Sequence, residues 1–330
     1  MADVHLPQVS ILMAVHNEER FLPLTLDALL GQTLQDFELI CVDDGSQDQT
    51  AHILQEYQQR NAHLRVLTNP TPQGLTISLN KALDQAEGTY IARADADDLY
   101  HPERLAKQVT YLEAHPDVVL LSSQRVDIDE HGQPLKVQKN SPLTNTAMRW
   151  RMLFDSPCLH SVVMWRASVN LRYNEAYRVA QDYELWSRMA QKGKMAALPE
   201  RLLLRRVHTK SISAKRGGEQ AENRDQVSLH MMQQAFGESA PDCKIIDRWR
   251  QSFIRPTRAP KVRDIVGYVD LLARYCEQQH WKNKARLLWQ RELTQQAKHL
   301  FLAYRWHLLP VLGLAALTQP RLRRKGITSG

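Results

Sequence analysis

Strand-length apolar runs alternate with helical stripes along the first third of the chain, and this alternation restricts the possible folds most strongly. The predicted strands are Val9–Val15, Phe37–Val42, Leu64–Leu67 and Tyr90–Ala94. Between them, apolar residues recur at helical spacing within Leu22–Leu30, Ile53–Tyr57 and Leu75–Ala86. Near-continuous apolar strands are typical of parallel sheets that are buried on both faces. The pattern therefore predicts an α/β fold with a mostly parallel, doubly wound sheet flanked by helices.

Polar residues follow three of these predicted strands at the point where each strand ends. His16 follows the first strand, Asp43 and Asp44 end the second, and Asp95 and Asp97 follow the fourth. Carboxyl ends of parallel strands joined by right-handed crossovers lie along one edge of a sheet, where open α/β sheets bind ligands. We expect these side chains to share one ligand.

The most acidic of these strand ends lies in Gly88–Arg104, which reads G-T-Y-I-A-R-A-D-A-D-D-L-Y-H-P-E-R. Asp95, Asp97 and Asp98 repel one another unless a cation or a hydrogen-bond donor compensates them. Mg²⁺ is usually held by one or two carboxylates together with substrate phosphates. The cluster therefore predicts a phosphate-bound divalent metal. The alternative is a polar turn in which Asp98 bonds to its own backbone.

Glycine-rich phosphate loops are missing from this edge. The sequence has no G-x-G-x-x-G after the first strand and no G-x-x-x-x-G-K-[ST], so we expect neither a dinucleotide-binding nor a P-loop site. A metal on Asp95 and Asp97 would supply the positive charge that such a loop otherwise directs at a diphosphate.

Four ordered motifs over about 90 residues resemble a known family. They lie in V-S-I-L-M-A-V-H-N-E-E, in L-I-C-V-D-D-G-S-Q-D-Q-T and in G-L-T-I-S-L-N-K-A-L-D-Q-A-E-G-T-Y-I-A-R-A-D-A-D-D. These segments resemble the donor-binding half of family 2 glycosyltransferases of the GT-A fold. The resemblance implies a nucleoside diphosphate sugar as cosubstrate, most often UDP-linked, and Mg²⁺ or Mn²⁺ as cofactor.

The resemblance also implies roles for individual residues. Asp43 and Asp44 would hold the base and ribose, while Asp95 would contact the ribose or the metal. Asp97 would ligate the metal that bridges the diphosphate. Ala14 and His16 stand where the family usually has Pro and Tyr, although His16 can still stack on a base. The predicted donor-binding set is Ala14, His16, Glu18, Asp43, Asp44, Arg93, Asp95, Arg206 and His208, with Asp95 and Asp97 as metal ligands.

Asp182 is the predicted catalytic base. Leu185, Trp186 and Met189 share one face of a predicted helix, and Asp182 begins that face. A carboxylate against an apolar wall has a raised proton affinity, which suits a general base, whereas spacing alone favours a helix N-cap. The segment D-Y-E-L-W-S-R-M-A-Q-K-G resembles the family's E-D-x-x-L-x-x-R-x-x-x-x-G, whose Asp deprotonates the acceptor hydroxyl in an inverting displacement. Gln181 replaces the usual Glu.

Basic and histidine residues complete the candidate site. Leu198–Ser213 resembles the family's closing strand and R-x-H-x-x-S turn, in which Arg206 and His208 would neutralise the leaving diphosphate. The alternative is a solvated basic turn on the surface. His160 either lines the acceptor pocket or is a structural histidine.

Charge divides the chain into two regions. Residues 1–200 carry 18 Lys+Arg and 26 Asp+Glu, a net charge of −8, whereas residues 201–330 carry 25 and 10, a net charge of +15; their sum is the total of +7. We predict a glycosyltransferase domain over 1–216, with a donor-binding half at 1–115 and an acceptor half at 116–216. A basic helical region follows at 217–330.

The C-terminal region interleaves aromatic and basic residues around the apolar run Leu308–Leu317, as in Trp281–Trp289 and the tail Arg321–Lys325. This composition suits an anionic membrane surface, where a lipid-linked glycan would be presented; a helical cap with solvated basic faces is the alternative. No nucleic-acid module accompanies it.

Three features of the sequence bear on where the protein is located. The apolar run Leu308–Leu317 is too short to span a bilayer, and the first residues lack a signal-peptide layout. The four cysteines show no C-x-x-C spacing. We therefore expect a cytoplasmic protein that is soluble or peripheral to the membrane.

The sequence thus predicts an inverting, metal-dependent glycosyltransferase. Its acceptor would be a hydroxyl of a glycan or lipid-linked glycan in cell-surface polysaccharide synthesis. Transfer to a polyprenyl phosphate needs no strong base and is an alternative within the same class. A non-catalytic sugar-nucleotide-binding protein is a second alternative, because Gln181 departs from the family pattern.

Overall fold

The structure is a computed structural model that describes residues 6–135, 144–208, 217–254 and 262–278. The chain divides into two compact units. The first comprises Met1–Arg149 and Ser156–Val227, and the second comprises Trp150–Asp155 and Ser228–Gly330. The segments predicted to dock on a membrane, Trp281–Trp289, Leu308–Leu317 and Arg321–Lys325, lie outside the described residues, so membrane docking stays a prediction.

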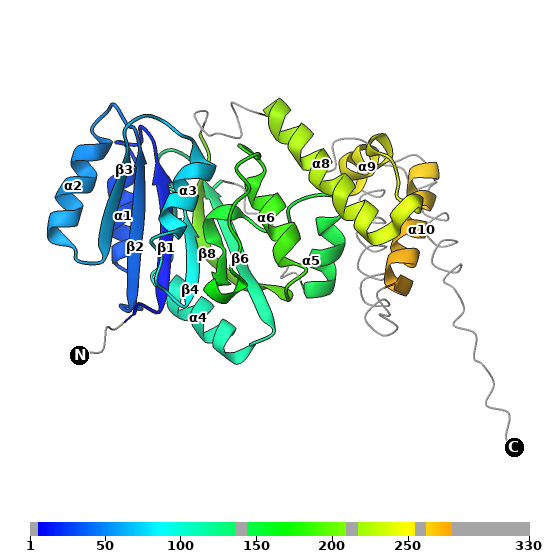
Figure 1. Ribbon diagram of the computed structural model, residues 1–330, viewed down its shortest axis with the longest axis horizontal. Coiled ribbons are helices and arrows are strands. Elements are labelled where there is room, and N and C mark those ends of the chain that lie inside the picture. Colours follow the sequence, from blue (N-terminus) through cyan, green and yellow to red (C-terminus); the bar gives the residue numbers. More distant parts are fainter. Residues whose placement is uncertain (1–5, 136–143, 209–216, 255–261, 279–330) are drawn as a thin grey trace, which may run out of the picture. The chain divides into compact units, whose positions relative to one another are not determined.

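An eight-stranded sheet forms the centre of the first unit (Figure 1). Its strands are β1 (Val9–Val15), β2 (Phe37–Asp44), β3 (Leu64–Asn69), β4 (Tyr90–Ala94), β5 (Leu99–Tyr100), β6 (Val118–Ile128), β7 (Met164–Arg166) and β8 (Lys194–Arg206). In space they follow the order β3-β2-β1-β4-β7-β6-β8-β5. The first four in this order are parallel, β7 runs antiparallel to both neighbours, and β5 pairs antiparallel with β8. The sheet is thus mixed, with a parallel half.

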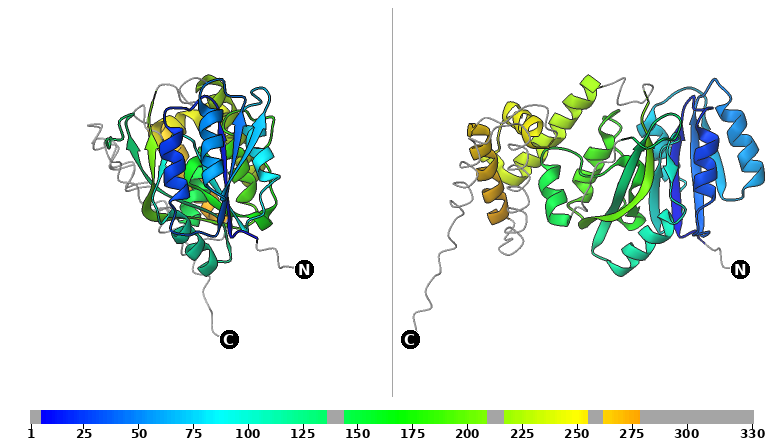
Figure 2. Two further views of the ribbon diagram at one scale, coloured as in Figure 1. Left: turned by 90° about the vertical axis from the view of Figure 1, so that its left-hand side faces the viewer. Right: turned by 180° about the vertical axis from the view of Figure 1, so that it is seen from behind.

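Helices cover both faces of the parallel half. The helices of this unit are α1 (Leu22–Leu30), α2 (Thr50–Arg60), α3 (Leu75–Leu83), α4 (Arg104–Ala114), α6 (Gln181–Met189), most of α5 (Asn145–Met152) and the first part of α8 (Gly217–Phe236). Alternate residues of β1, such as Ile11 and Met13, share one core with Leu26 of α1 and Leu105 of α4. The helix α3 packs on β1 and β2 from the opposite face, so α3 lies in front of these strands in Figure 1 and α1 in the reverse view of Figure 2.

The second unit is helical and has an aromatic core. It contains the last part of α8, α9 (Cys243–Trp249), a π-helical turn (Arg250–Ile254) and α10 (Val262–Gln278). The indole Nε1 of Trp150 donates to the hydroxyl of Tyr268 at 2.9 Å, and the ring of Phe253 lies 4.5 Å from the same tyrosine ring. The buried Arg250 donates through Nε to the carbonyl of Phe154 at 2.6 Å. No helix in the described parts of the chain is long and apolar enough to span a membrane.

The structure confirms the predicted α/β fold and the four predicted strands, with two of them extended at their carboxyl ends. It also adds two short strands, β5 and β7, that the sequence analysis did not predict. Two or three residues are too few to show an alternating pattern, and these strands form because β8, β4 and β6 lie beside them. Long-range pairing therefore decided the second half of the sheet.

Gly88, just before β4, provides a test of how closely β1 and β4 pack. A Cβ at this position would lie 2.5 Å from the backbone nitrogen of Ser10, which is closer than real Cβ atoms come. We expect Gly88→Ala to lower the free energy of unfolding by about 1–3 kcal/mol in urea denaturation, because the strands must separate. Gly218→Ala is the matched control, since no atom lies within 4 Å of its added Cβ, and it should be neutral or stabilising by up to about 1 kcal/mol. Equal effects of the two substitutions would contradict this account.

Candidate active site

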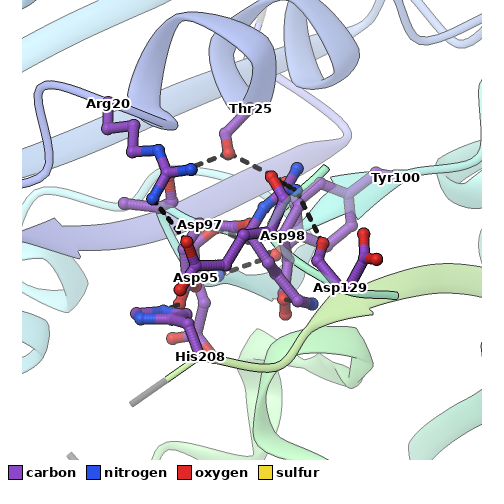
Figure 3. Close-up of polar contacts among 11 residues, drawn as sticks. Arg20, Thr25, Asp95, Asp97, Asp98, Tyr100, Asp129 and His208 are labelled. Atoms are coloured by element: carbon purple, nitrogen blue, oxygen red, sulfur yellow. Dashed lines mark hydrogen bonds and ion pairs between the residues drawn. The ribbon is translucent and has the colours of Figure 1, made fainter. Parts of the chain in front are cut away.

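Three carboxylates crowd together in the turn between β4 and β5 (Figure 3). One oxygen atom from each of Asp95, Asp97 and Asp98 lies within 4.8 Å of the others. The side chains of Asp95 and Asp97 are 39% and 23% exposed, whereas Asp98 is buried. The turn therefore presents two acids to solvent and keeps a third behind them.

Side chains from two other elements hold the backbone of this turn. The hydroxyl of Thr25, on α1, lies 2.8 Å from the carbonyl oxygens of both Ala96 and Asp98 and donates to them. The hydroxyl of Tyr100, on β5, accepts from the backbone N–H of Asp95 at 2.7 Å and donates to its carbonyl at 3.1 Å. These contacts hold the main chain of the turn that carries the acids (Figure 3).

The end of β8 binds the turn from another side. The backbone N–H of Arg206 donates to Oδ1 of Asp98 at 2.9 Å, and its Nε donates to the carbonyl of Asp97 at 3.0 Å. Its Nη1 donates to the carbonyls of Asp129 and Glu130, and its guanidinium lies 4.3 Å from the centroid of the Phe21 ring. Arg206 is 6% exposed, so the alternative of a solvated basic turn is wrong for this residue.

His208 contacts the acid cluster directly. Its Nε2 lies 2.8 Å from Oδ2 of Asp97, and its side chain is 6% exposed. The structure thus brings together His208, Arg206 and Asp97, which the sequence had assigned to one site. Their predicted contacts with a donor diphosphate stay a prediction.

The electrostatics of the turn favour a bound cation. Burial and the neighbouring Asp95 raise the pKa of Asp97, and His208 only partly opposes this shift. Burial together with Asp95 and Asp97 raises the pKa of Asp98 well above its usual value. Carboxylates that resist ionisation because they are buried and also repel one another are stabilised by a divalent cation, and oxygen donors are the ligands that Mg²⁺ and Mn²⁺ prefer. The residues present therefore fit such a metal.

The ends of β1 and β2 lie beside the acid cluster. In the sheet register Val15 pairs with Asp43 and Met13 pairs with Ala94, so the three strands end along one edge, as the sequence predicted. The exposed His16 places Nδ1 2.8 Å from the carbonyl oxygen of Asp44. Asp43 is buried and accepts the backbone N–H of Ser46 at 3.1 Å.

Two further predicted donor-binding residues flank this edge. Ala14 is a half-buried residue of β1. Glu18 is half-buried in the loop that follows β1, and its backbone N–H donates to the hydroxyl of Thr50 at 2.9 Å. Both lie at the same end of the sheet as Asp43, and their roles toward a donor stay a prediction.

The carboxylate of Asp44 accepts hydrogen bonds from other residues of the protein. Its Oδ1 accepts from Nδ2 of Asn69 at 2.7 Å and from the backbone N–H of Gln73 at 2.8 Å, and its Oδ2 accepts from the backbone N–H of Gly74 at 2.8 Å. Burial by itself would raise the pKa of Asp44, but these hydrogen bonds outweigh it and hold the pKa below its usual value. Asp44 therefore anchors the segment that leads into α3.

Asp182 lies in the first turn of α6 and is half-buried. The N-cap of this helix is Ala180, in the left-handed conformation with φ 58°, so the alternative that Asp182 is the N-cap is wrong. The predicted apolar face is confirmed, since Leu185, Trp186 and Met189 are buried. Gln181 is buried as well.

Tyr173 connects the region of Asp182 with the acid cluster. Its pKa is raised first by burial, and the charges of Asp182 and Asp95 both add to the shift. Its hydroxyl lies 2.8 Å from Nε2 of His160. Burial, and then the charge of Arg93, lower the pKa of His160 well below its usual value, so His160 is neutral. The structure supports His160 as a partner of Tyr173.

Several residues of the site escaped the sequence analysis, among them Thr25, Tyr100 and Asn80. Asn80 lies on α3, is 2% exposed, and bonds through its amide to both the N–H and the carbonyl of Tyr173 at 3.0 Å. A polar residue on the buried side of a helix was a signal that could have identified Asn80. Thr25 and Tyr100 carried no local signal, because their partners are main-chain atoms brought close by the fold.

Comparison with known proteins identifies the family. Residues 10–170 match Glycosyl transferase family 2. An uncharacterized glycosyltransferase of Haemophilus influenzae is 30% identical over 253 residues, which cover 73% of this chain and 78% of that protein. The amylovoran biosynthesis glycosyltransferase AmsE of Erwinia amylovora is 29% identical over 213 residues, or 63% of this chain and 79% of that protein. The chain belongs to the family 2 glycosyltransferases.

The fold agrees with this assignment. The crystal structure of S. aureus TarS 1-349 in complex with UDP-GlcNAc superimposes with a TM-score of 0.59 at 17% identity, over 94% of this chain and 91% of that chain. At this level of identity the likeness concerns the fold alone. The protein is therefore a glycosyltransferase of the GT-A fold.

The hydrogen bonds of Asp44 predict how stability depends on pH. An amide at this position cannot accept all three hydrogen bonds, so we expect Asp44→Asn to lower the free energy of unfolding by about 1–3 kcal/mol at neutral pH. The pKa of Asp44 is lower in the folded state, so its contribution is complete above the ordinary aspartate pKa and is lost as pH falls through the folded-state pKa.

Urea denaturation at a series of pH values measures this effect, and the difference between the native protein and Asp44→Asn should shrink in acid. Asp84→Asn is the control, because Asp84 forms an exposed ion pair with Arg172 and should cost less than about 1 kcal/mol. A difference that stays constant down to acidic pH would contradict the assignment.

Proposed function

We propose that this glycosyltransferase is metal-dependent and inverting, and that it transfers a sugar from a UDP-sugar to a hydroxyl group of a glycan. The observation that carries the proposal is the group of three carboxylates within 4.8 Å, at the edge where β1, β2 and β4 end together. This edge is the usual ligand site of an open α/β sheet. The crowded acids require a compensating cation, which a nucleotide diphosphate would share.

In this proposal Asp95 and Asp97 hold the metal, because they are the two acids of the cluster with exposed side chains. A bound Mg²⁺ or Mn²⁺ supplies positive charge to the diphosphate that departs. Asp43, His16, Ala14 and Glu18 line the part of the edge assigned to the base and ribose. The UDP-GlcNAc complex of TarS, which has the same fold, supports UDP as the nucleotide.

Asp182 acts as the general base in the proposed mechanism. It removes the proton from the acceptor hydroxyl while the oxygen attacks the anomeric carbon, which inverts the configuration at that carbon. It lies half-buried in the first turn of α6, and the buried Leu185 and Trp186 follow it on the same side of the helix.

The acceptor class is inferred from relatives. AmsE is named an amylovoran biosynthesis glycosyltransferase, and WbnJ of Escherichia coli, 30% identical over 215 residues, is named an O-antigen biosynthesis glycosyltransferase. We therefore propose a growing glycan, free or lipid-linked, as the acceptor. A polysaccharide hydroxyl needs deprotonation, which agrees with the assignment of a base to Asp182.

The donor site is tested by calorimetric titration of UDP with Mn²⁺, with Mg²⁺ or with a chelator. We expect metal-dependent binding of UDP, and Asp97→Asn should weaken it about 10- to 100-fold because a ligand is lost. GDP serves as the competing nucleotide. Binding of UDP that is identical with chelator and with metal would exclude the proposed metal site.

The base is tested by the kinetics of Asp182→Asn with a UDP-sugar and a glycan acceptor. We expect kcat to fall about 10²- to 10⁴-fold while the KM for the donor stays unchanged, since a base acts in the transition state. Glu184→Gln is the control, because Glu184 shares the first turn of α6 but pairs with Arg188. Proton NMR of the first product formed identifies the anomer. Retained configuration, or an active Asp182→Asn, would overturn the proposed mechanism.

A further inference from the structure

Arg93 is a completely buried cation beside the acid cluster. It belongs to β4, two residues before Asp95, and its side chain has 0% exposure. Its Nη2 donates to Oδ1 of Asp95 at 2.6 Å. In the described part of the chain, its Nε and Nη1 have no hydrogen-bond acceptor. The charged guanidinium of Arg93 is therefore enclosed within the protein, and the carboxylate that it contacts is that of Asp95.

The surroundings of Arg93 make this contact significant. Removing a guanidinium from water is costly, and an ionised partner compensates that cost far better than a neutral one. Uncharged side chains that face Arg93 from other elements are those of Tyr173, Tyr100, His160 and Cys41. The guanidinium of Arg104, a like charge, also faces it. Asp95 is the carboxylate bonded to Arg93, so the contact fixes the orientation of both side chains.

The burial of Arg93 also limits how it acts on a substrate. A side chain without exposed surface does not contact a donor that enters from solvent, so the burial of Arg93 argues against the direct donor contact predicted from the sequence. Asp95, by contrast, is 39% exposed and has a second oxygen, Oδ2, that Arg93 does not bind in the structure. Any influence of Arg93 on the donor is therefore transmitted through Asp95.

We propose that Arg93 is a positioning residue that holds Oδ1 of Asp95 and thereby presents Oδ2 to the metal. The inference rests on the proposed metal site and goes beyond it, because it assigns the orientation of a ligand to a residue that touches neither metal nor donor. Partners that orient a metal ligand typically change metal affinity about 10- to 100-fold when they are replaced. This role requires arginine, because its planar guanidinium donates hydrogen bonds in fixed directions. The ammonium group of lysine is a point charge without fixed donor directions.

Arg104 provides a matched control. It is also completely buried, but its Nε donates to Oε1 of Gln108 at 3.1 Å and its Nη2 donates to the carbonyl of Arg93 at 2.7 Å. Its guanidinium lies 4.8 Å from the centroid of the Tyr100 ring. Arg104→Lys therefore disturbs a buried arginine in the same region without removing a bond to a carboxylate of the cluster.

The experiment measures Mn²⁺ affinity by electron paramagnetic resonance of the free ion, with and without UDP. In Arg93→Lys we expect the Kd for Mn²⁺ to rise about tenfold or more, whereas Arg104→Lys should change it less than about twofold. Calorimetry with chelator present should give the same UDP affinity for the native protein and both variants. Thermal unfolding reports the loss of stability, which is expected for both.

Three results separate the possible failures. If Arg93→Lys binds Mn²⁺ as tightly as the native protein while Asp97→Asn does not, the positioning role is wrong and the metal site stands. If UDP binding without metal weakens in Arg93→Lys, Arg93 contacts the donor and the proposal is overturned. If Asp97→Asn also leaves Mn²⁺ binding unchanged, the proposed metal site itself fails.

Asp95→Asn tests the proposal without altering the buried arginine. An amide held by Arg93 turns its oxygen to the guanidinium and its NH₂ group, which cannot ligate, to the metal. We expect Asp95→Asn to lose Mn²⁺ affinity as strongly as Asp97→Asn, about 10- to 100-fold. A loss below about threefold would show that the side chain turns freely, and it would overturn the positioning role even if Arg93→Lys does not fold.

Discussion

Repulsion among three carboxylates is the physical constraint on which this structure depends. Asp95, Asp97 and Asp98 offer oxygen atoms within 4.8 Å of one another, which no short peptide would maintain in water without compensation. The protein supplies hydrogen bonds to the turn from α1, β5 and β8, and a buried cation from β4. Burial, and then the neighbouring carboxylates, still raise the pKa values of Asp97 and Asp98. The remaining negative charge is what makes the turn suitable for a cation.

The same constraint explains why the two halves of the glycosyltransferase domain depend on each other. The acids belong to the half that was predicted to bind the donor, but Arg206 and His208, which bond to them, come from the end of β8 and the residues just after it. In the other direction, Asn80 of α3 holds both backbone groups of Tyr173 in the half that carries Asp182. Each half therefore supplies hydrogen bonds to the part of the site that belongs to the other.

The sequence predicted the parallel half of the fold well, because each strand there is a long apolar run followed by its own helix. β1, β2 and β4 were placed correctly for this reason, and the alignment of His16, Asp43 and Asp95 followed from the rule for right-handed crossovers. The second half was predicted poorly. β7 has three residues and is inserted antiparallel between β4 and β6, a position that depends on strands distant in sequence.

The sequence by itself determined the fold class, the family and the identity of the clustered acids, because these depend on local apolar periodicity and on motifs that are contiguous in the chain. Only the tertiary structure decided which of these residues face the site and which support it. Asp44 and Asp95 look alike in the sequence, yet Asp44 is saturated by Asn69, Gln73 and Gly74, whereas Asp95 keeps an oxygen that Arg93 does not bind. Hydrogen-bond partners that are many residues away make this difference, since a carboxylate's role depends on the groups that the fold brings to it.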